Sequence, residues 1–281
     1  MEAYSFRQYI YDDCKFDLKD VIVSEECFQR TGFGKYVFNV NMDGFLVAPG
    51  KVMLDVKRPL FASSSRVKDA EDYMARGCTL LLVQWPMTAS GSFRKTFHTF
   101  KQSLRHLPVD HMIVPKVPIQ LLTSDMVRFL GRQACPFIMI EVEEEHFLHA
   151  KAWEWLEEGQ SFRRIPFTVS SPALWSKWQE MCQYYGMIHL VDPIEDELTL
   201  ENLKVSGIYP YKGRLIPNGY ADYNLYWLGE GSPIDGEINF RYHDAVPNVT
   251  VMRGKITQVN QSVLASDPGK SMNVAIPKHF V

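Results

Sequence analysis

The sequence lacks the features that mark membrane, secreted and nucleic-acid-binding proteins. It has no run of about eighteen apolar residues, so no membrane-spanning helix is expected. Its first residues, 1–7, show no basic stretch followed by an apolar one, so no secretory signal is expected. The formal net charge is −3, which gives no general attraction to nucleic acid or to an anionic membrane. We therefore expect neither nucleic acid nor membrane among its partners.

Cysteine is scarce and lacks metal-binding spacing. An odd number of scattered cysteines without a CxxC pair indicates reduced, buried thiols rather than disulfides or a zinc ribbon. The sequence therefore predicts a cytoplasmic protein. The five cysteines are Cys14, Cys27, Cys78, Cys135 and Cys182.

Histidine is present, but no two histidines are separated by a single residue. His-x-His is the spacing with which a strand presents two ligands to one metal. His146 and His149 would share a helix face, yet they follow the acidic run 143–145 and are expected at an exposed helix start. The eight histidines are His98, His106, His111, His146, His149, His189, His243 and His279.

The middle of the chain alternates apolar runs with helix-forming stretches, which is typical of a parallel sheet buried on both faces. We count about six βα units in roughly 155 residues, whereas a complete eight-fold barrel needs about 250. The sequence therefore predicts an α/β fold with a shortened or incomplete (β/α) TIM-like barrel. Ser124 is the expected N-cap of the third helix. Strands are predicted at 52–56, 79–85, 111–117, 136–142, 164–169 and 187–191, and helices at 66–76, 93–104, 124–132, 149–158 and 171–185.

Both ends of the chain read as antiparallel β-structure. Residues 18–47 alternate apolar and polar side chains, with a turn at 41–44. Further strands are expected at 223–228, 237–242 and 249–256, bounded by glycine, proline and asparagine.

Four segments stand out by their order and their spacing from the two chain ends. They are 43–59 with Pro49-Gly50, 75–86 with a strand ending in Pro86, 208–225 with Lys212-Gly213 and Ala221-Asp222, and 249–256 with Arg253-Gly254-Lys255. On these segments the chain resembles the amidohydrolase superfamily, in its branch of dihydropyrimidinases, hydantoinases and dihydroorotases. Between residues 117 and 200 the resemblance rests on the βα rhythm alone.

The resemblance implies a division into two domains. In that family, strands from both chain ends meet in a small β-sandwich beside the barrel. Residues 1–50 and 208–281 would then form a composite β-sandwich domain, and residues 51–207 the barrel-like domain. A homo-oligomer is expected, because a shortened barrel would expose apolar helix faces. The tryptophans on those faces are Trp153, Trp155, Trp175 and Trp178.

The resemblance also implies a metal site whose ligands are replaced here. In the family, a Pro-Gly is followed by a strand ending in His-x-His, and both histidines hold zinc. In this sequence Asp55 and Lys57 stand at the two histidine positions. A protonated lysine cannot ligate zinc and repels a cation. Asp55 and Lys57 are two residues apart, so on a strand they would face one side and could form an ion pair.

Polar residues at the predicted carboxyl ends of the strands make up the candidate site, because this edge carries the chemistry of βα barrels. One interpretation is a remodelled pocket for an anionic small molecule, with no catalytic residue. In the alternative, Asp55, Glu141, His189 and Asp192 hold one divalent metal such as manganese or zinc. The ligand-binding candidates are Asp55, Lys57, Lys116, Glu141, His189 and Asp192.

Two functions are compatible with these observations. The first is an amidohydrolase-like protein that has lost metal-dependent hydrolysis, needs no cofactor, and acts as a scaffold, as the partner subunit of an enzyme, or as a small-ligand binder. The second is a metal-dependent hydrolase of cyclic amides, acting on carbon–nitrogen bonds through an unusual mononuclear site. The metal content of the purified protein distinguishes them.

Overall fold

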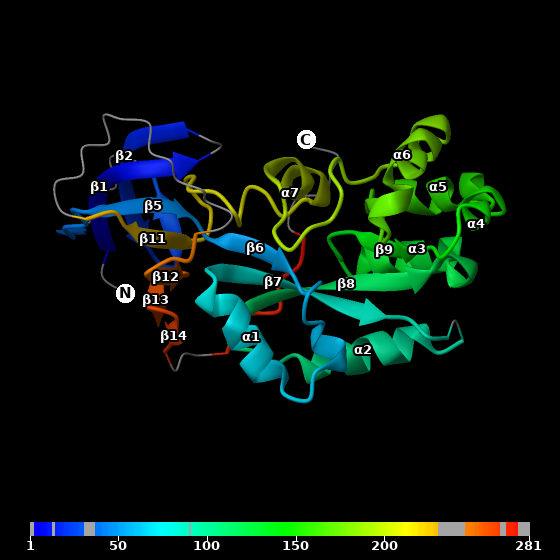
Figure 1. Ribbon diagram of the computed structural model, residues 1–281, viewed down its shortest axis with the longest axis horizontal. Helices are drawn as coiled ribbons and strands as arrows, with labels where there is room; N and C mark the ends of the chain where they lie inside the picture. Colours follow the sequence, from blue (N-terminus) through cyan, green and yellow to red (C-terminus); the bar gives the residue numbers. More distant parts are fainter. Residues whose placement is uncertain are drawn as a thin grey trace. The chain divides into compact units, whose positions relative to one another are not determined.

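The computed structural model describes residues 3–12, 15–30, 37–89, 91–229, 245–264 and 268–274 (Figure 1). The chain divides into two compact units. The first comprises Met1–Val52, Ala70–Leu80 and Pro210–Asp267, and the second comprises Met53–Asp69, Leu81–Tyr209 and Pro268–Val281. Among the described residues, no helix is long and apolar enough to cross a membrane.

The first sheet joins strands from both ends of the chain. β11 pairs antiparallel with β5 on one side and with β12 on the other. The long hairpin β1–β2 pairs from Tyr4↔Val23 to Asp12↔Lys15. The β-sandwich expected from these strands stays a prediction. The nine strands are β1 (Ala3–Asp12), β2 (Lys15–Ser24), β3 (Cys27–Gln29), β4 (Val37–Asn39), β5 (Phe45–Pro49), β11 (Tyr223–Trp227), β12 (Val249–Met252), β13 (Lys255–Val259) and β14 (Ser262–Val263).

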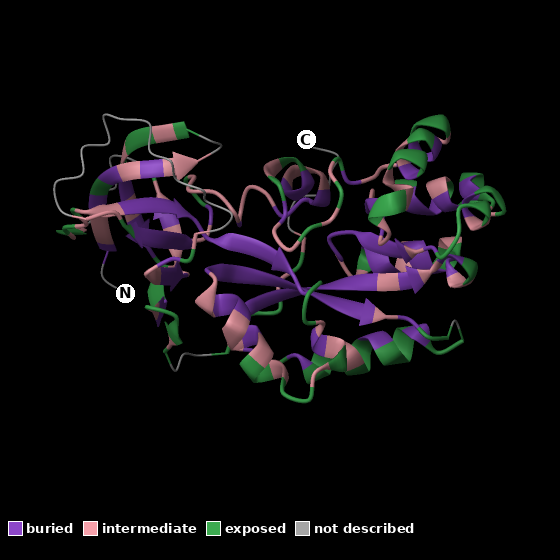
Figure 2. Ribbon diagram, viewed as in Figure 1, coloured by how far each residue is buried: buried purple, intermediate pink, exposed green. Residues whose placement is uncertain are grey.

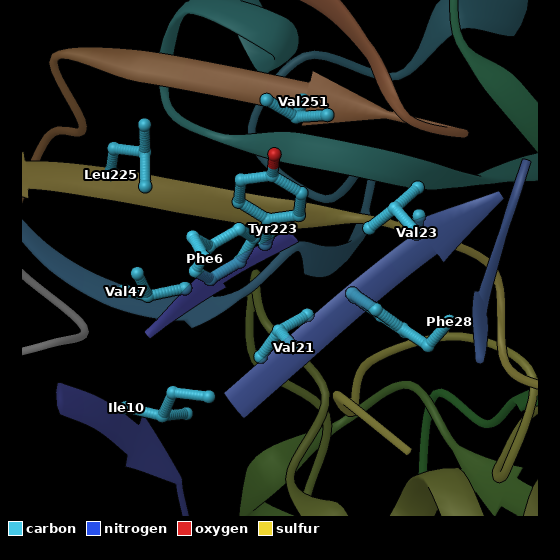
Figure 3. Close-up of a cluster of buried hydrophobic side chains, with 10 residues drawn as sticks. Phe6, Ile10, Val21, Val23, Phe28, Val47, Tyr223, Leu225 and Val251 are labelled. Carbon is cyan, nitrogen blue, oxygen red and sulfur yellow. The ribbon is translucent and has the colours of Figure 1, made fainter. Parts of the chain in front are cut away.

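A cluster of buried apolar side chains forms the core of the first unit (Figure 3). Alternate residues of β1 and β2 enter it, as the period of two in a half-buried strand requires. Tyr223 contributes a ring whose hydroxyl lies 3.0 Å from the Tyr4 hydroxyl. The cluster contains Phe6, Ile10, Val21, Val23, Phe28, Val47, Ala221, Tyr223, Leu225 and Val251.

The segment 249–256, predicted as a strand, forms parts of two strands, β12 and β13, which are joined by a hairpin. Met252 pairs with Lys255, and the two residues between them have φ of 52° at Arg253 and 71° at Gly254. Two left-handed residues in a two-residue loop match the twist of antiparallel strands. The strand predicted at 237–242 lies outside the described residues.

The second sheet is parallel and curls into a half-barrel. Its strands follow the order β10-β9-β8-β7-β6. Eight of the nine residues of β7 are buried, in keeping with a strand covered on both faces (Figure 2). This confirms the parallel α/β sheet that the apolar runs predicted. The strands are β6 (Lys51–Leu54), β7 (Cys78–Pro86), β8 (Asp110–Pro118), β9 (Ile138–Glu141) and β10 (Phe167–Val169).

Helices alternate with these strands close to their predicted positions. In α3, the N-cap is Thr123 rather than the predicted Ser124, because the Thr123 hydroxyl accepts the Met126 N–H at 3.3 Å. The helices are α1 (Arg66–Ala75), α2 (Phe93–Ser103), α3 (Ser124–Arg132), α4 (His146–His149), α5 (Trp153–Ser161), α6 (Trp175–Tyr184) and α7 (Leu200–Ser206), with 3-10 turns η1 (Leu60–Ala62), η2 (Ile119–Leu121) and η3 (Pro172–Leu174).

The four tryptophans do not form one exposed face. Trp153 and Trp178 are fully buried, with ring centroids 5.6 Å apart. The indole N–H of Trp153 donates to the Leu148 carbonyl at 2.7 Å. These two therefore belong to the core, whereas Trp155 is 68% exposed and Trp175 is half-buried.

The prediction of a sixth strand at 187–191 is wrong. Only one bridge forms there, between His189 and Phe167. Side chains form hydrogen bonds with the backbone N–H and carbonyl groups that a longer strand would use to pair with β10. Gln160 accepts from the Ile188 N–H at 2.8 Å and donates to its carbonyl at 2.6 Å. Asn202 accepts from the Val191 N–H at 2.9 Å.

The tail residues 268–274 lie beside β8 within the second unit. The Lys270 carbonyl accepts from the His111 N–H at 3.0 Å, and the Met272 N–H donates to the His111 carbonyl at 2.8 Å. His111 stands at the amino end of its strand, as predicted.

Candidate functional site

The carboxyl edge of the second sheet carries the candidate residues. Asp55 follows β6, Lys116 lies near the end of β8, and Glu141 ends β9. His189 forms the bridge next to β10, and Asp192 follows it. All of them belong to the second unit.

Asp55 is fully buried and its carboxyl group binds the backbone. Oδ2 accepts from the Leu60 N–H at 2.8 Å, and Oδ1 accepts from the Gln84 N–H at 2.9 Å. Burial raises the pKa of Asp55 to about 7, against the opposing effect of these hydrogen bonds. Asp55 therefore fixes the turn 55–60 against β7 and presents no free carboxylate to solvent.

Lys57 does not pair with Asp55, so the predicted ion pair is wrong. Its ammonium pairs with Asp196 instead, and its side chain is 70% exposed. The physical reason is that β6 ends at Leu54. Beyond that residue the chain turns, and the alternation that would place Asp55 and Lys57 on one face no longer holds.

Lys116 and Glu141, from neighbouring parallel strands, meet at this edge. Their Nζ and Oε1 atoms are 2.8 Å apart, and the side chains are 24% and 43% exposed. The register that pairs Pro118 with Glu141 brings them together. Such a partly exposed pair contributes little stability.

His189 and Asp192 are engaged locally. Nδ1 of His189 lies 3.2 Å from the Met187 carbonyl oxygen. The Asp192 carboxylate accepts from the Thr199 hydroxyl at 2.5 Å. Thr199 in turn caps α7, accepting from the Asn202 N–H at 3.3 Å. Asp192 thus supports the start of a helix.

The residues at this edge do not fit a metal ion. Across the described ranges, no group of three histidine, cysteine, aspartate or glutamate side chains is placed to hold one. Both Asp55 oxygens already accept backbone N–H groups, and Lys57 is a cation. The alternative ligand set of Asp55, Glu141, His189 and Asp192 therefore does not come together as one site.

Sequence reasoning missed two partners at this edge. Asp196 neutralises Lys57, and Gln84 donates its side-chain amide to the Asp55 carbonyl at 3.0 Å. Gln84 was visible as a polar residue in an apolar strand. Asp196 lies in a loop far along the chain, where the sequence carries no signal for the pair.

An apolar pocket of about 510 Å³ lies in the first unit. Tyr4 and Tyr223 line it together with side chains from β4, β5, β12 and β13. Its described lining residues include no charged side chain, so they offer no group for acid–base or metal chemistry.

Comparisons with known proteins concern the fold. No family model matches the chain, and no curated protein matches it by sequence. Among solved structures, a D-hydantoinase (dihydropyrimidinase) from Thermus sp. superposes with a TM-score of 0.58 at 11% identity, covering 99% of this chain and 100% of that one. A dihydropyrimidinase from Brevibacillus agri gives 0.58 at 9% identity, covering 93% and 96%.

A triazine hydrolase from Arthobacter aurescens gives a TM-score of 0.51 at 10% identity, covering 95% of this chain and 97% of that one. At such identities the likeness concerns the fold and not the activity. The fold of this chain is therefore similar to the folds of this D-hydantoinase, this dihydropyrimidinase and this triazine hydrolase.

Proposed function

We propose that this chain is an amidohydrolase-fold protein that does not perform metal-dependent hydrolysis and acts as a scaffold or partner subunit. Under this proposal, residues 1–50 and 208–281 form the composite β-domain and 51–207 the barrel-like domain. Asp55 and Lys57 stand where the resembling family has its two zinc-binding histidines.

The bonding of Asp55 is the observation that supports this proposal. A ligand of a catalytic metal needs an oxygen aimed at open space and a deprotonated carboxylate. The Asp55 oxygens instead hold the Leu60 and Gln84 N–H groups, in a site closed to solvent. With a pKa raised from 3.8 to about 7 by burial, this carboxyl group keeps its proton between these pH values, where an ordinary aspartate is already ionised.

The other candidates support a structural role for the edge. Lys57 pairs with Asp196, and Lys116 with Glu141. Asp192 accepts from Thr199. Each charge has a partner within the chain, which favours a scaffold over a site that waits for a ligand.

Exposed aromatic side chains favour assembly with another protein. Trp155 is 68% exposed, and Tyr184 is 83% exposed. Phe162, just after α5, is 49% exposed. Aromatic residues are enriched at the centres of protein interfaces. A homo-oligomer or a complex with a partner enzyme accounts for their exposure, and sedimentation at micromolar concentration would detect the homo-oligomer.

Metal content tests the proposal. The purified protein is incubated with zinc or manganese, freed of unbound metal, and analysed for metal per chain and for hydrolysis of hydantoin and dihydropyrimidines. We expect far less than one metal per chain and no hydrolysis. Asp125→Ala, at an exposed position of α3, is the control. One metal per chain that is lost in Asp55→Ala but kept in the control, together with hydrolysis, contradicts the proposal.

The second candidate is binding of a small anionic ligand at the same edge, through Asp55, Lys57, Lys116, Glu141, His189 and Asp192. One observation favours it: the buried Thr168 hydroxyl, on β10, has no hydrogen-bond partner among the described residues. Lys116 would leave Glu141 to bind the anion. A saturable change in intrinsic fluorescence with dicarboxylates, lost in Lys116→Met, would support this candidate.

A further inference from the structure

Helix α2 of the second unit carries a basic surface in a stretch of sequence without acidic residues. From Tyr73 to Val109 the chain has no aspartate or glutamate, although the whole sequence has 33 of them. Lys95 on α2 and Arg105 just after it are both exposed. Within the described chain, no ion pair or hydrogen bond engages either side chain. These two cations define the basic surface.

The stability of α2 does not account for these cations. Arg94 and Lys95 lie in its first turn, which holds no acidic residue. A cation is unfavourable there, because the amino end of a helix carries a partial positive charge. The N-cap residue, Ser92, makes no side-chain hydrogen bond that would offset this effect. Arg94 is at least paired with Asp125 at 2.7 Å, whereas Lys95 brings the helix no local benefit.

A complementary acidic surface lies on α4 and the start of α5 in the same unit. Residues 143–158 contain six glutamates and one lysine. Glu143 and Glu154 are exposed, and within the described ranges neither has an ion-pair partner. Trp155, next to Glu154, is 68% exposed. These three residues define the acidic surface, which combines free carboxylates with an aromatic ring of the kind that anchors interfaces.

A structural alternative explains the glutamates but not the cations. Glu154 lies in the first turn of α5, where a carboxylate stabilises a helix. Lys95 occupies the same part of α2, where its charge has the opposite effect. The basic surface therefore needs another cause. A partner of opposite charge supplies one, because complementary charges speed association and fix its register.

The chemistry of α2 favours an acidic protein surface over other anionic partners. Proteins that bind nucleic acid neutralise several phosphates, whereas the described part of this surface offers two free, exposed cations. A helix that binds a membrane needs an exposed apolar face, but Phe93 and Phe97 of α2 are buried. The second unit itself carries a fitting partner surface, on α4 and α5.

We propose that the basic surface of one copy of this chain binds the acidic surface of a second copy. Trp155 of one copy then lies against the Lys95 or Arg105 side chain of the other, a contact that the electrons of the indole ring favour. The two surfaces differ, so the contact is heterologous and repeats from copy to copy until the assembly closes into a ring or extends. The inference rests on the homo-oligomer of the proposed function and not on the loss of hydrolysis.

Sedimentation of the full chain at low and high salt tests the contact. At low salt the average mass is expected to rise with protein concentration beyond that of a dimer. The apparent dissociation constant should rise at least about tenfold between about 50 and 500 mM sodium chloride, because salt screens exposed charges. A chain that stays monomeric at low salt overturns the contact. A monomer that instead binds a DNA oligonucleotide through Lys95 and Arg105 overturns it in favour of nucleic acid.

Two double variants separate the surfaces. Lys95→Gln/Arg105→Gln removes the basic surface, and Glu154→Gln/Trp155→Ala removes most of the acidic one. All four residues are exposed, so both variants should fold. Each variant alone should be monomeric. An equimolar mixture should form a dimer and nothing larger, because each chain then keeps one surface, acidic on the first variant and basic on the second.

Lys177→Gln/Glu180→Gln is the matched control. It removes an exposed ion pair of 3.3 Å on α6 of the same unit, and it should self-associate as the unmodified chain does. Self-association that survives in either double variant overturns this contact, yet leaves a homo-oligomer built on another surface. A mixture that fails to dimerise also overturns it. The metal assay reports separately on hydrolysis, so the two failures are distinguishable.

Discussion

Asp55 and Gln84 are joined by two hydrogen bonds, and Gln84 donates both of them. The Gln84 N–H donates to Asp55 Oδ1 at 2.9 Å, and the Gln84 side-chain amide donates to the Asp55 carbonyl at 3.0 Å. Both residues are buried. The end of β6 is thereby fixed to β7 through polar groups where a strand pair would otherwise fray. The Asp55 carboxyl group thus holds the turn after β6 against β7.

Replacing Asp55 by alanine should cost about 2–6 kcal/mol of unfolding free energy. Two buried N–H groups, of Leu60 and Gln84, lose their acceptor, and each unsatisfied group costs about 1–3 kcal/mol. Urea denaturation measures the loss. Asp125→Ala, which removes an exposed pair with Arg94, should change stability by less than about 1 kcal/mol. Equal effects of the two substitutions would contradict the structural role of Asp55.

Replacing Lys57 should have little effect on the stability of the protein. Lys57→Met removes a mostly exposed ion pair with Asp196, so it should cost less than about 1 kcal/mol. Lys57→His should not bind zinc tightly, because one histidine and one buried carboxyl fall short of the three protein ligands of a catalytic zinc. Isothermal titration with zinc measures this. Tight binding with hydrolysis of a cyclic amide would show that the rest of a catalytic site is intact.

Asp55 should make stability fall as pH rises from about 4 to 7. Burial raises its folded-state pKa to about 7 from 3.8. Between these values the folded chain keeps a proton that the unfolded chain releases, so its contribution is complete below pH 3.8 and lost as pH rises through 7. The change amounts to about 4 kcal/mol.

Comparison with Asp55→Asn isolates that effect. His111, whose pKa is lowered by burial, acts in the opposite direction, because its contribution is lost as pH falls. Both proteins share His111, so the difference in unfolding free energy between them reports Asp55 alone. As pH rises from 4 to 7, the unmodified protein should lose unfolding free energy relative to the asparagine variant. A constant difference across this range would mean that Asp55 is not perturbed.

A buried ion pair in the first unit gives a further prediction. Lys212 and Asp222 pair with side chains that are each 1% exposed, and Asp222 also accepts from the Arg253 N–H at 2.8 Å. Lys212→Met should therefore cost about 3–5 kcal/mol, because it leaves a buried charge behind. Lys204→Met, which breaks an exposed pair with Glu201, is the control and should cost less than about 1 kcal/mol.

The sequence predicted those parts of the fold that depend on local pattern. β7 was predictable because it contains the continuous apolar run Leu80–Val83. The strand predicted at 249–256 is divided into β12 and β13, because Arg253 and Gly254 form a two-residue turn with positive φ. The prediction of a sixth strand was wrong. Gln160 and Asn202, which lie elsewhere in the chain, accept hydrogen bonds from its backbone N–H groups. Such competition is invisible in the apolar pattern of 187–191.

That the carboxyl edge is a functional site stays a prediction, and the bonding of its residues could not be predicted from the sequence. Lys116 and Glu141 lie near the carboxyl ends of neighbouring parallel strands and form an ion pair there. The partner of Asp55 depends on the register of β6 against β7, and the partner of Lys57 on a loop far along the chain. Neither is fixed by neighbouring residues, so neither could be derived before the structure.

Gly50 should not tolerate a side chain, because Thr79 fills the space that the side chain would need. A Cβ at position 50 would lie 2.3 Å from the Thr79 hydroxyl oxygen and 2.6 Å from its methyl carbon. Gly50→Ala should therefore cost about 1–3 kcal/mol through overpacking. Thr79→Ala alone should cost less, because the buried Thr79 hydroxyl makes no hydrogen bond among the described residues.

The double variant decides whether this contact explains the Pro-Gly pair. Thr79→Ala removes both atoms that clash, so the combined cost should fall below the sum of the single costs by about 1 kcal/mol or more. Urea denaturation of the four proteins gives the coupling energy. If the costs of the two substitutions are additive, the cost of Gly50→Ala does not arise from contact with Thr79. A coupling of the expected size would mean that glycine is needed here for close packing of β6 on β7, which does not depend on any catalytic site.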